Sequence, residues 1–323
     1  MSNLDDRPAE VTCTAETSPG VQLMTPRDVP LGGARAMTVR RTLPQRERSL
    51  IGAWCFVDHY GPDDVSETGG MLVAPHPHTG LQTVSWLFTG EIEHRDSAGH
   101  HAMVRPGEVN LMTAGHGISH SEVSTAQTRT LHGAQLWVAL PEGARDQAPG
   151  FVHHAPDAVT GAGWEARVFL GSLLGDTSPV PTATPLLGAE VLLDAGTTLT
   201  LDVDESFEHG VLVDRGAVEV GGTRAEPDDL AYVPPGSASL TLTSYDEPVR
   251  VLVLGGPPFG ESIVMWWNFV GRTHEEIVGF RKQWQSQLTD SGLADGRFGI
   301  PVGQDLPPIP APPLPNARLK QRH

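Results

Sequence analysis

An internal repeat constrains the fold of this 323-residue chain more than any other feature of its sequence. The segment 87–93 (LFTGEIE) resembles 212–219 (LVDRGAVE), and 110–115 (NLMTAG) resembles 231–236 (AYVPPG). Both copies follow the order strand, Gly turn, strand, turn, strand, Gly turn. Self-similarity of this kind indicates a duplicated structural unit. The sequence therefore predicts two similar units in one chain.

Short apolar segments between frequent turn residues indicate that these units are built of strands. The chain contains 36 Gly and 28 Pro, which separate segments such as 83–88, 133–140 and 250–254. This pattern is typical of a sandwich or a small barrel. We predict an all-β chain with two antiparallel β-barrels of jelly-roll type. The expected divisions are a polar leader at 1–35, an N-terminal barrel at 36–158, and a C-terminal barrel with a helix and a Pro-rich tail at 159–323.

One helix is predicted near the C-terminus, from His274 to Leu288. Thr273 is suited to cap it, and Glu276 three residues later completes a capping box. Apolar residues then recur at helical spacing on one face, at positions 277, 280, 284 and 288. The Pro-rich tail from Leu306 to Pro315 is expected to be an extended strap on the surface.

Two pairs of potential metal ligands lie in the first unit. His76 and His78 form one pair, and His120 and Glu122 form the other. Residues i and i+2 of a strand point to the same side. Two such strands facing into one barrel would bring three imidazoles and one carboxylate together, which suits iron, nickel, copper or zinc. For either pair alone, a hydrogen-bonded surface pair is the alternative explanation.

The repeat predicts that only the first unit carries this ligand set. Aligning the two copies places Asp202 and Asp204 opposite the first pair, and Thr241 and Thr243 opposite the second. The second unit thus keeps the scaffold but has no imidazole at these positions. We expect one metal site, in the N-terminal half.

The other histidines have simpler explanations. Eleven of the fourteen lie between residues 59 and 154. The pairs at 100–101 and 153–154 are expected to be solvated, and His59 and His94 to be hydrogen-bonded structural residues. His116 precedes His120 by four residues and is a candidate for the mouth of a pocket.

Charge and composition bear on partners and location. The formal net charge of −17 argues against general electrostatic binding to nucleic acid. No run of eighteen apolar residues suggests a membrane span, and residues 1–20 do not resemble a signal peptide. Cys13 and Cys55 are not expected to form a bridge, which suits a reducing compartment. We expect a cytoplasmic protein and a monomer.

Two long segments resemble the signatures of the pirin family. These are 76–97 (HPHTGLQTVSWLFTGEIEHRDS) and 106–122 (PGEVNLMTAGHGISHSE), which match without gaps and in the right order. The resemblance covers about residues 40–140 strongly and the second unit more weakly. It implies a bicupin, with one iron bound in the N-terminal barrel by residues matching His76, His78, His120 and Glu122. It also implies that the C-terminal barrel holds no metal.

The chain departs from the family pattern at two positions. Many pirins have a glutamate where this chain has Gln82, and often a basic residue where it has Thr79. An amide is a poorer metal ligand than a carboxylate. We expect Gln82 to form a hydrogen bond that orients a ligand or a substrate, or to satisfy a buried backbone group.

The resemblance also implies a reaction. Similar proteins are quercetin 2,3-dioxygenases, which cleave a flavonol with O2 and release carbon monoxide. Fe(II) would stabilise the deprotonated 3-hydroxyl, and Glu122 would accept its proton. Ni, Cu, Mn or Zn are possible substitutes. An apolar pocket wall, or alternatively plain barrel core, is expected from Leu81, Trp86 and Met112.

A function of a different class stays open. Pirins also act as iron-dependent, redox-responsive regulators that bind a transcription factor or a metabolic enzyme. An enzyme would need an open channel to the metal, whereas a regulator suits a pocket filled by its own side chains. A third possibility is the storage or sensing of another small molecule at the same metal.

Overall fold

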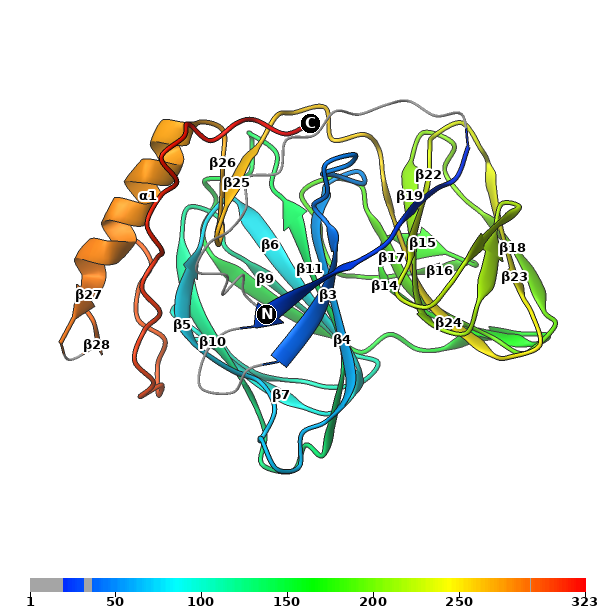
Figure 1. The fold of residues 1–323 in the computed structure, drawn as a ribbon, viewed down its shortest axis with the longest axis horizontal. Coiled ribbons are helices and arrows are strands. Elements are labelled where there is room, and N and C mark those ends of the chain that lie inside the picture. Colours follow the sequence, from blue (N-terminus) through cyan, green and yellow to red (C-terminus); the bar gives the residue numbers. More distant parts are fainter. Residues whose placement is uncertain (1–19, 32–36, 291) are drawn as a thin grey trace.

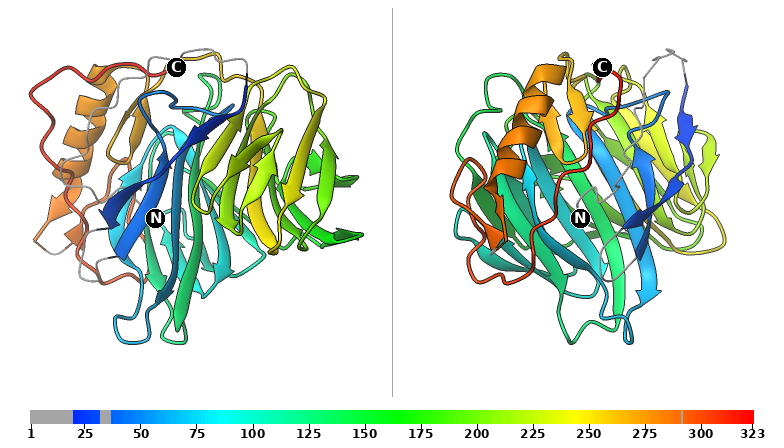
Figure 2. Two further views of the ribbon diagram at one scale, coloured as in Figure 1. Left: turned by 45° about the vertical axis from the view of Figure 1, so that its right-hand side comes forward. Right: turned by 60° about the vertical axis from the view of Figure 1, so that its left-hand side comes forward.

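The computed structural model describes residues 20–31, 37–290 and 292–323. Nearly all regular structure in these residues is antiparallel strand, with one helix, so the all-β fold with a duplicated unit is confirmed. Most of the predicted leader at 1–35 lies outside the described residues, as does Cys13. Figures 1 and 2 show the two units side by side.

The N-terminal unit consists of two sheets. Its larger sheet has the order β12 (Gly150–His154), β9 (Val109–Thr113), β6 (Leu81–Thr89), β11 (Thr130–Ala139), β4 (Trp54–Asp64), β3 (Met37–Leu43), β2 (Arg27–Leu31). Its smaller sheet has the order β5 (Leu72–His78), β10 (Ile118–Ser124), β7 (Ile92–Asp96), β8 (His101–Val104).

The C-terminal unit repeats this topology. Its larger sheet has the order β1 (Gln22–Met24), β22 (Leu230–Val233), β19 (Glu208–Arg215), β24 (Val249–Gly256), β17 (Leu187–Leu193), β14 (Trp164–Leu170), β13 (Val159–Gly161). Its smaller sheet has the order β18 (Thr198–Asp202), β23 (Ser239–Ser244), β20 (Val218–Val220), β21 (Thr223–Ala225). The predicted jelly-roll type is thus confirmed for each unit, although its two sheets do not close into a continuous barrel.

Three short hairpins complete the fold. They are β15 (Ser172–Leu173) with β16 (Asp176–Thr177), β25 (Val264–Trp266) with β26 (Phe269–Gly271), and β27 (Leu288–Thr289) with β28 (Gly292–Leu293). The second of these hairpins precedes the helix and lies beside the N-terminal unit (Figure 1).

The two units exchange their terminal segments. Strand β1 precedes the N-terminal unit in sequence but pairs with β22 of the C-terminal unit, with Gln22 opposite Tyr232. Conversely, β26 bridges to the end of β5 through Phe269 and Thr79, and the Ile309 N–H donates to the Pro75 carbonyl at 2.8 Å. The helix and the tail therefore cover the edge of the smaller N-terminal sheet (Figures 1 and 2). The boundaries at residues 36 and 159 stay predictions.

The predicted helix is confirmed as α1 (His274–Gln287), one residue shorter than expected. The Thr273 side chain accepts a hydrogen bond from the Glu276 N–H at 3.2 Å, as expected of an N-cap. Ile277, Phe280 and Trp284 are buried against the β25–β26 hairpin and the tail. The described part of the chain contains no helix long and apolar enough to cross a bilayer.

A shared apolar core joins the two units. One cluster of buried side chains contains residues of both larger sheets, including Trp54 and Trp86 from the first and Leu212 and Leu252 from the second. The Trp86 ring stacks on Phe169 with centroids 4.6 Å apart. The sheet faces that look toward each other are therefore apolar over most of their area, and the units form one body.

Candidate metal centre

Strand β5 owes its position to its two prolines. Pro75 and Pro77 cannot donate backbone hydrogen bonds, and β5 is the edge strand of the smaller sheet, where proline is tolerated. Gly80 follows with φ +66°, and a side chain there would strike the Val270 carbonyl of β26. The two prolines thus suit the edge position of β5, and Gly80 suits the turn that follows the first histidine pair.

The second pair lies on the neighbouring strand. In the β5–β10 ladder His120 is opposite His76, and the register shifts before Glu122, which is opposite Val73. Such a bulge re-aims side chains, and bulges are frequent beside functional sites. The predicted pairs therefore come from adjacent strands of one sheet.

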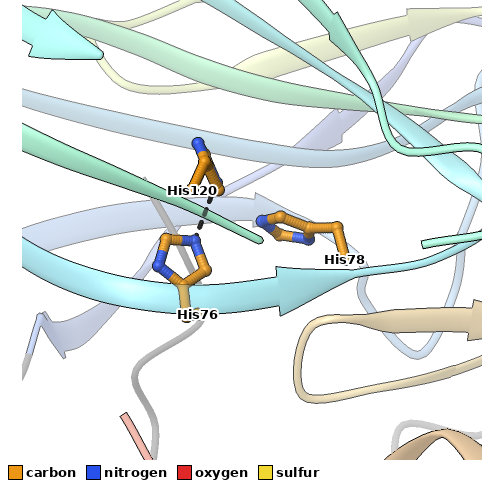
Figure 3. Close-up of side chains that lie close together, drawn as sticks. All are labelled: His76, His78 and His120. Atoms are coloured by element: carbon orange, nitrogen blue, oxygen red, sulfur yellow. Dashed lines mark hydrogen bonds between the residues drawn. The ribbon is translucent and has the colours of Figure 1, made fainter. Parts of the chain in front are cut away.

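Three imidazoles converge inside the N-terminal unit (Figure 3). The ring centroids of His76, His78 and His120 lie 4.3 to 5.1 Å apart, and Nε2 of His76 is 2.8 Å from Nε2 of His120. All three side chains are fully buried. One ligand atom of each lies within 4.8 Å of the other two.

The hydrogen bonds leave Nε2 of each ring as the lone-pair nitrogen. His76 donates from Nδ1 to the Ala74 carbonyl at 2.8 Å, and His78 donates from Nδ1 to the Asn268 carbonyl at 3.1 Å. His78 Nε2 is buried and has no hydrogen-bond partner. Adjacent lone pairs repel one another, whereas a cation between them would be attracted by each. These residues therefore fit a metal ion.

For His120 as well, the hydrogen bonds leave Nε2 as the lone-pair nitrogen, and here the partner is His94. His94 Nε2 lies 3.2 Å from an Asp96 carboxylate oxygen and must donate to it, so His94 Nδ1 is an acceptor. His120 Nδ1 lies 3.4 Å from that acceptor and donates to it. A carboxylate–histidine arrangement of this kind orients metal-binding imidazoles in many proteins.

Burial keeps these imidazoles neutral. It lowers the pKa of His76 to about 4, and it lowers the pKa of His78 and His120 well below the ordinary value. For the latter two, the neighbouring histidines lower the pKa further because like charges repel. At neutral pH all three rings are in the form that binds metals.

Glu122 completes the group. It is buried, and one of its carboxylate oxygens lies within 4.8 Å of ligand atoms of His94 and His120. The structure thus brings His76, His78 and His120 together and places Glu122 beside His120 and His94, and the contact of His94 was not predicted. The pairing of the strands would have revealed this contact, because His94 lies opposite Glu122 in the β7–β10 ladder.

Two of the predicted pocket residues lie in an apolar cluster beside the histidines. Leu81 and Met112 pack in one core cluster with Phe56 and Trp137. The Trp137 ring meets His78 edge-on with centroids 5.1 Å apart and stacks on Phe56 at 4.0 Å. Phe56 and Trp137 are functional candidates that the sequence analysis did not name, and only the strand pairing reveals them.

The remaining predicted residues lie elsewhere. Alternation along β6 places Gln82 on the same face as Trp86, which belongs to the core between the units. Gln82 Nε2 donates to Thr113 Oγ1 at 2.9 Å. The His116 side chain is exposed, and its carbonyl accepts a hydrogen bond from Arg297 at 2.6 Å. Among the described residues, His116 does not belong to any group of close metal ligands.

The histidine pairs that were expected to be solvated are partly so. His101 and His153 are exposed, whereas His100 and His154 are half-buried. The His100 side chain is 38% exposed, and its Nδ1 contacts the Asp96 carboxylate at 3.1 Å, the same carboxylate that accepts from His94.

Comparisons with known proteins find relatives of both units. Residues 36–138 match the Pirin family model, and residues 188–289 match the model of the Pirin C-terminal cupin domain. A Pseudomonas aeruginosa protein named "Putative quercetin 2,3-dioxygenase" is 43% identical and covers 98% of each chain. A "Pirin-like protein" of Caulobacter vibrioides is 35% identical over 82% of this chain and 93% of its own. The crystal structure of a quercetin 2,3-dioxygenase from Acinetobacter baumannii has a TM-score of 0.85 at 37% identity, and the match covers 92% of this chain and 97% of that one.

Proposed function

Because the chain belongs to the pirin family of metal-binding bicupins, we propose that it is an Fe(II)-dependent dioxygenase that cleaves a flavonol such as quercetin with O2. The observation that carries the proposal is the convergence of three buried imidazole Nε2 atoms beside a buried carboxylate. The names of the relatives from Pseudomonas and Acinetobacter support the choice of substrate. In this account His76, His78, His120 and Glu122 hold the metal. Iron is proposed over nickel, copper, manganese or zinc, all of which suit a mixed nitrogen and oxygen set.

The proposed metal supplies a positive charge that favours the flavonolate anion and a redox partner for O2. The other tasks fall to the chain itself. Glu122 is the one carboxylate of the four ligands, and it accepts the proton of the flavonol 3-hydroxyl.

The apolar cluster beside His78 would bind the aromatic rings of the substrate. Leu81, Met112, Phe56 and Trp137 carry no charge and are buried against one another, so they would have to move apart to admit the rings. Aromatic side chains suit a flat polyphenol, and they would exclude water from the reacting carbon atoms. The overall reaction then consumes one flavonol and one O2, opens the central ring and releases the carbon that bore the 3-hydroxyl as carbon monoxide.

The test is a reconstitution. Apoprotein is loaded with Fe(II) without air, quercetin and air are added, and flavonol loss is followed together with carbon monoxide release. We expect Glu122→Gln to lower kcat by about 10²-fold or more, because a positioned base contributes this much. Glu219→Gln is the matched control, since Glu219 is a half-buried strand glutamate of the C-terminal unit. The proposal fails if the loaded wild-type protein releases no carbon monoxide, or if Glu122→Gln turns over at the wild-type rate.

One contact favours a second candidate function, a redox-responsive regulator that binds a transcription factor or a metabolic enzyme. His78 donates to the carbonyl of Asn268, which lies in the turn between β25 and β26, next to helix α1. A change of metal charge would therefore be felt by the segment that covers the edge of the N-terminal unit. The regulator predicts different amide hydrogen exchange in residues 264–287 between the Fe(II) and Fe(III) forms. Identical exchange in both forms would count against it.

A further inference from the structure

The seam between the two units holds a second group of potential metal ligands. His59 of β4 and His132 of β11 come from the N-terminal unit, and Asp214 of β19 comes from the C-terminal unit. All three residues are buried, and one ligand atom of each lies within 4.8 Å of the other two. The two histidines belong to the larger sheet of the first unit and Asp214 to the larger sheet of the second, and none of the three is part of the centre described above.

Hydrogen bonds to one carboxylate oxygen hold the two imidazoles of this group together. Nε2 of His59 and Nε2 of His132 lie 2.8 and 2.5 Å from the same oxygen, Asp214 Oδ1. The two imidazole centroids are 5.6 Å apart. These distances are those of hydrogen bonds in the metal-free protein, and a cation bound between the three groups would replace the protons that they share.

Two of the three ligands also have a second polar partner. His59 Nδ1 contacts Asp228 Oδ1 at 2.9 Å, so the His59 ring lies between two carboxylates. Asp214 Oδ2 receives Arg250 Nη1 at 3.3 Å, which orients the carboxylate. Such outer partners fix the ring orientation of metal-binding histidines and increase their basicity.

We propose that His59, His132 and Asp214 form a second site for a divalent cation of zinc type, which ties the two units together. Two imidazoles and one carboxylate, with a water as the fourth ligand, are a tetrahedral set that zinc accepts. Because the ligands come from both units, the bound ion stabilises their association. The proposal does not depend on flavonol cleavage at the first centre.

A proton is the competing occupant of this site. Burial alone would lower the pKa of His59, but its hydrogen bonds to Asp214 and Asp228 outweigh that effect and raise it. In the metal-free protein a protonated His59 therefore satisfies both carboxylates, while Arg40 and Arg250 add further positive charge. Metal uptake must release this proton, so the affinity of the seam site falls as the pH is lowered.

The experiment counts zinc ions on the full chain. Purified apoprotein is dialysed against Zn(II), and the bound metal is measured by elemental analysis for three proteins. We expect two equivalents for the wild type and one for His76→Ala/His120→Ala, which lacks two ligands of the first centre. Adding His132→Gln to this double variant should remove the last equivalent. Co(II) is the spectroscopic probe, and its tetrahedral absorption should appear in the double variant.

A second variant, with a milder substitution, tests the site even if the protein with His132→Gln does not fold. Asp228 is not a ligand, so Asp228→Asn in the double variant should retain the site but weaken Zn(II) binding about 10- to 100-fold. Asp202→Asn, an exposed aspartate of the C-terminal unit, should change nothing. The proposal is overturned if the double variant binds no zinc, or if Asp228→Asn binds it as tightly as the double variant alone.

Discussion

At the level of single residues, hydrogen bonds to Nδ1 decide which nitrogen of each imidazole is left for a metal. His76 and His78 donate to backbone carbonyls, whereas His120 depends on His94 and, through it, on Asp96. A carbonyl of the fold is hard to replace, but His94 is a side chain that can be changed. Its role is to position His120.

We expect His94→Gln to weaken metal binding by about 10- to 100-fold, because loss of an outer partner of a metal ligand has that effect. The control is His101→Gln, since the His101 side chain is 50% exposed and contacts Glu93. Competition with a chelator of known affinity measures both variants. Equal affinities for the two would show that His94 does not position His120.

The ligand pairs could be predicted from the sequence because strand alternation is local, whereas the place of His94 depends on the β7–β10 register, which is not local. Alternation also places Leu81 and Gln82 on opposite faces of β6. Which face looks toward the histidines depends on how the two sheets pack, and no local pattern encodes that. Trp86 was therefore assigned to the pocket although it lies in the core between the units.

Among the elements, helix α1 was predictable and the strand partners at the termini were not. The capping box and the apolar spacing of α1 lie within one short segment. Strand β1 instead pairs with β22, about two hundred residues away, and its three residues carry no sign of that partner. Pairing between distant segments is set by the packing of the whole chain.

The N-cap of α1 should contribute measurably to the stability of the segment that covers β5. Thr273→Ala removes the acceptor for the Glu276 N–H and is expected to lower the free energy of unfolding by about 1 kcal/mol. Thr273→Ser keeps the hydroxyl and should lose much less. Urea unfolding followed by tryptophan fluorescence measures both, and equal losses would contradict the cap.

At the level of the whole molecule, a group of ionisable residues lies where the two units meet. His59 faces Asp214, Asp228, Arg40 and His132. Its pKa is raised in the folded protein, mainly because the hydrogen bonds to the two carboxylates outweigh burial. The duplicated topology could be inferred from the repeat, but this network needs the two larger sheets to meet face to face.

The sign of the pH dependence follows from that shift. A histidine whose folded pKa is raised stabilises the protein fully below its ordinary value of about 6.5, and this contribution is lost as the pH rises through the folded pKa. In metal-free protein, the difference in free energy of unfolding between wild type and His59→Gln should therefore shrink as the pH rises above 6.5. Chemical denaturation across this range measures it, and a constant or growing difference would disprove the assignment.

We propose above all that three imidazoles of the N-terminal unit bind the metal through Nε2. X-ray absorption at the iron edge, on protein loaded with one equivalent of Fe(II), counts those imidazoles directly. The account predicts three imidazoles and an oxygen ligand in the wild type, and two imidazoles in His78→Gln. A wild-type spectrum without imidazole scattering, or three imidazoles still present in His78→Gln, would contradict it.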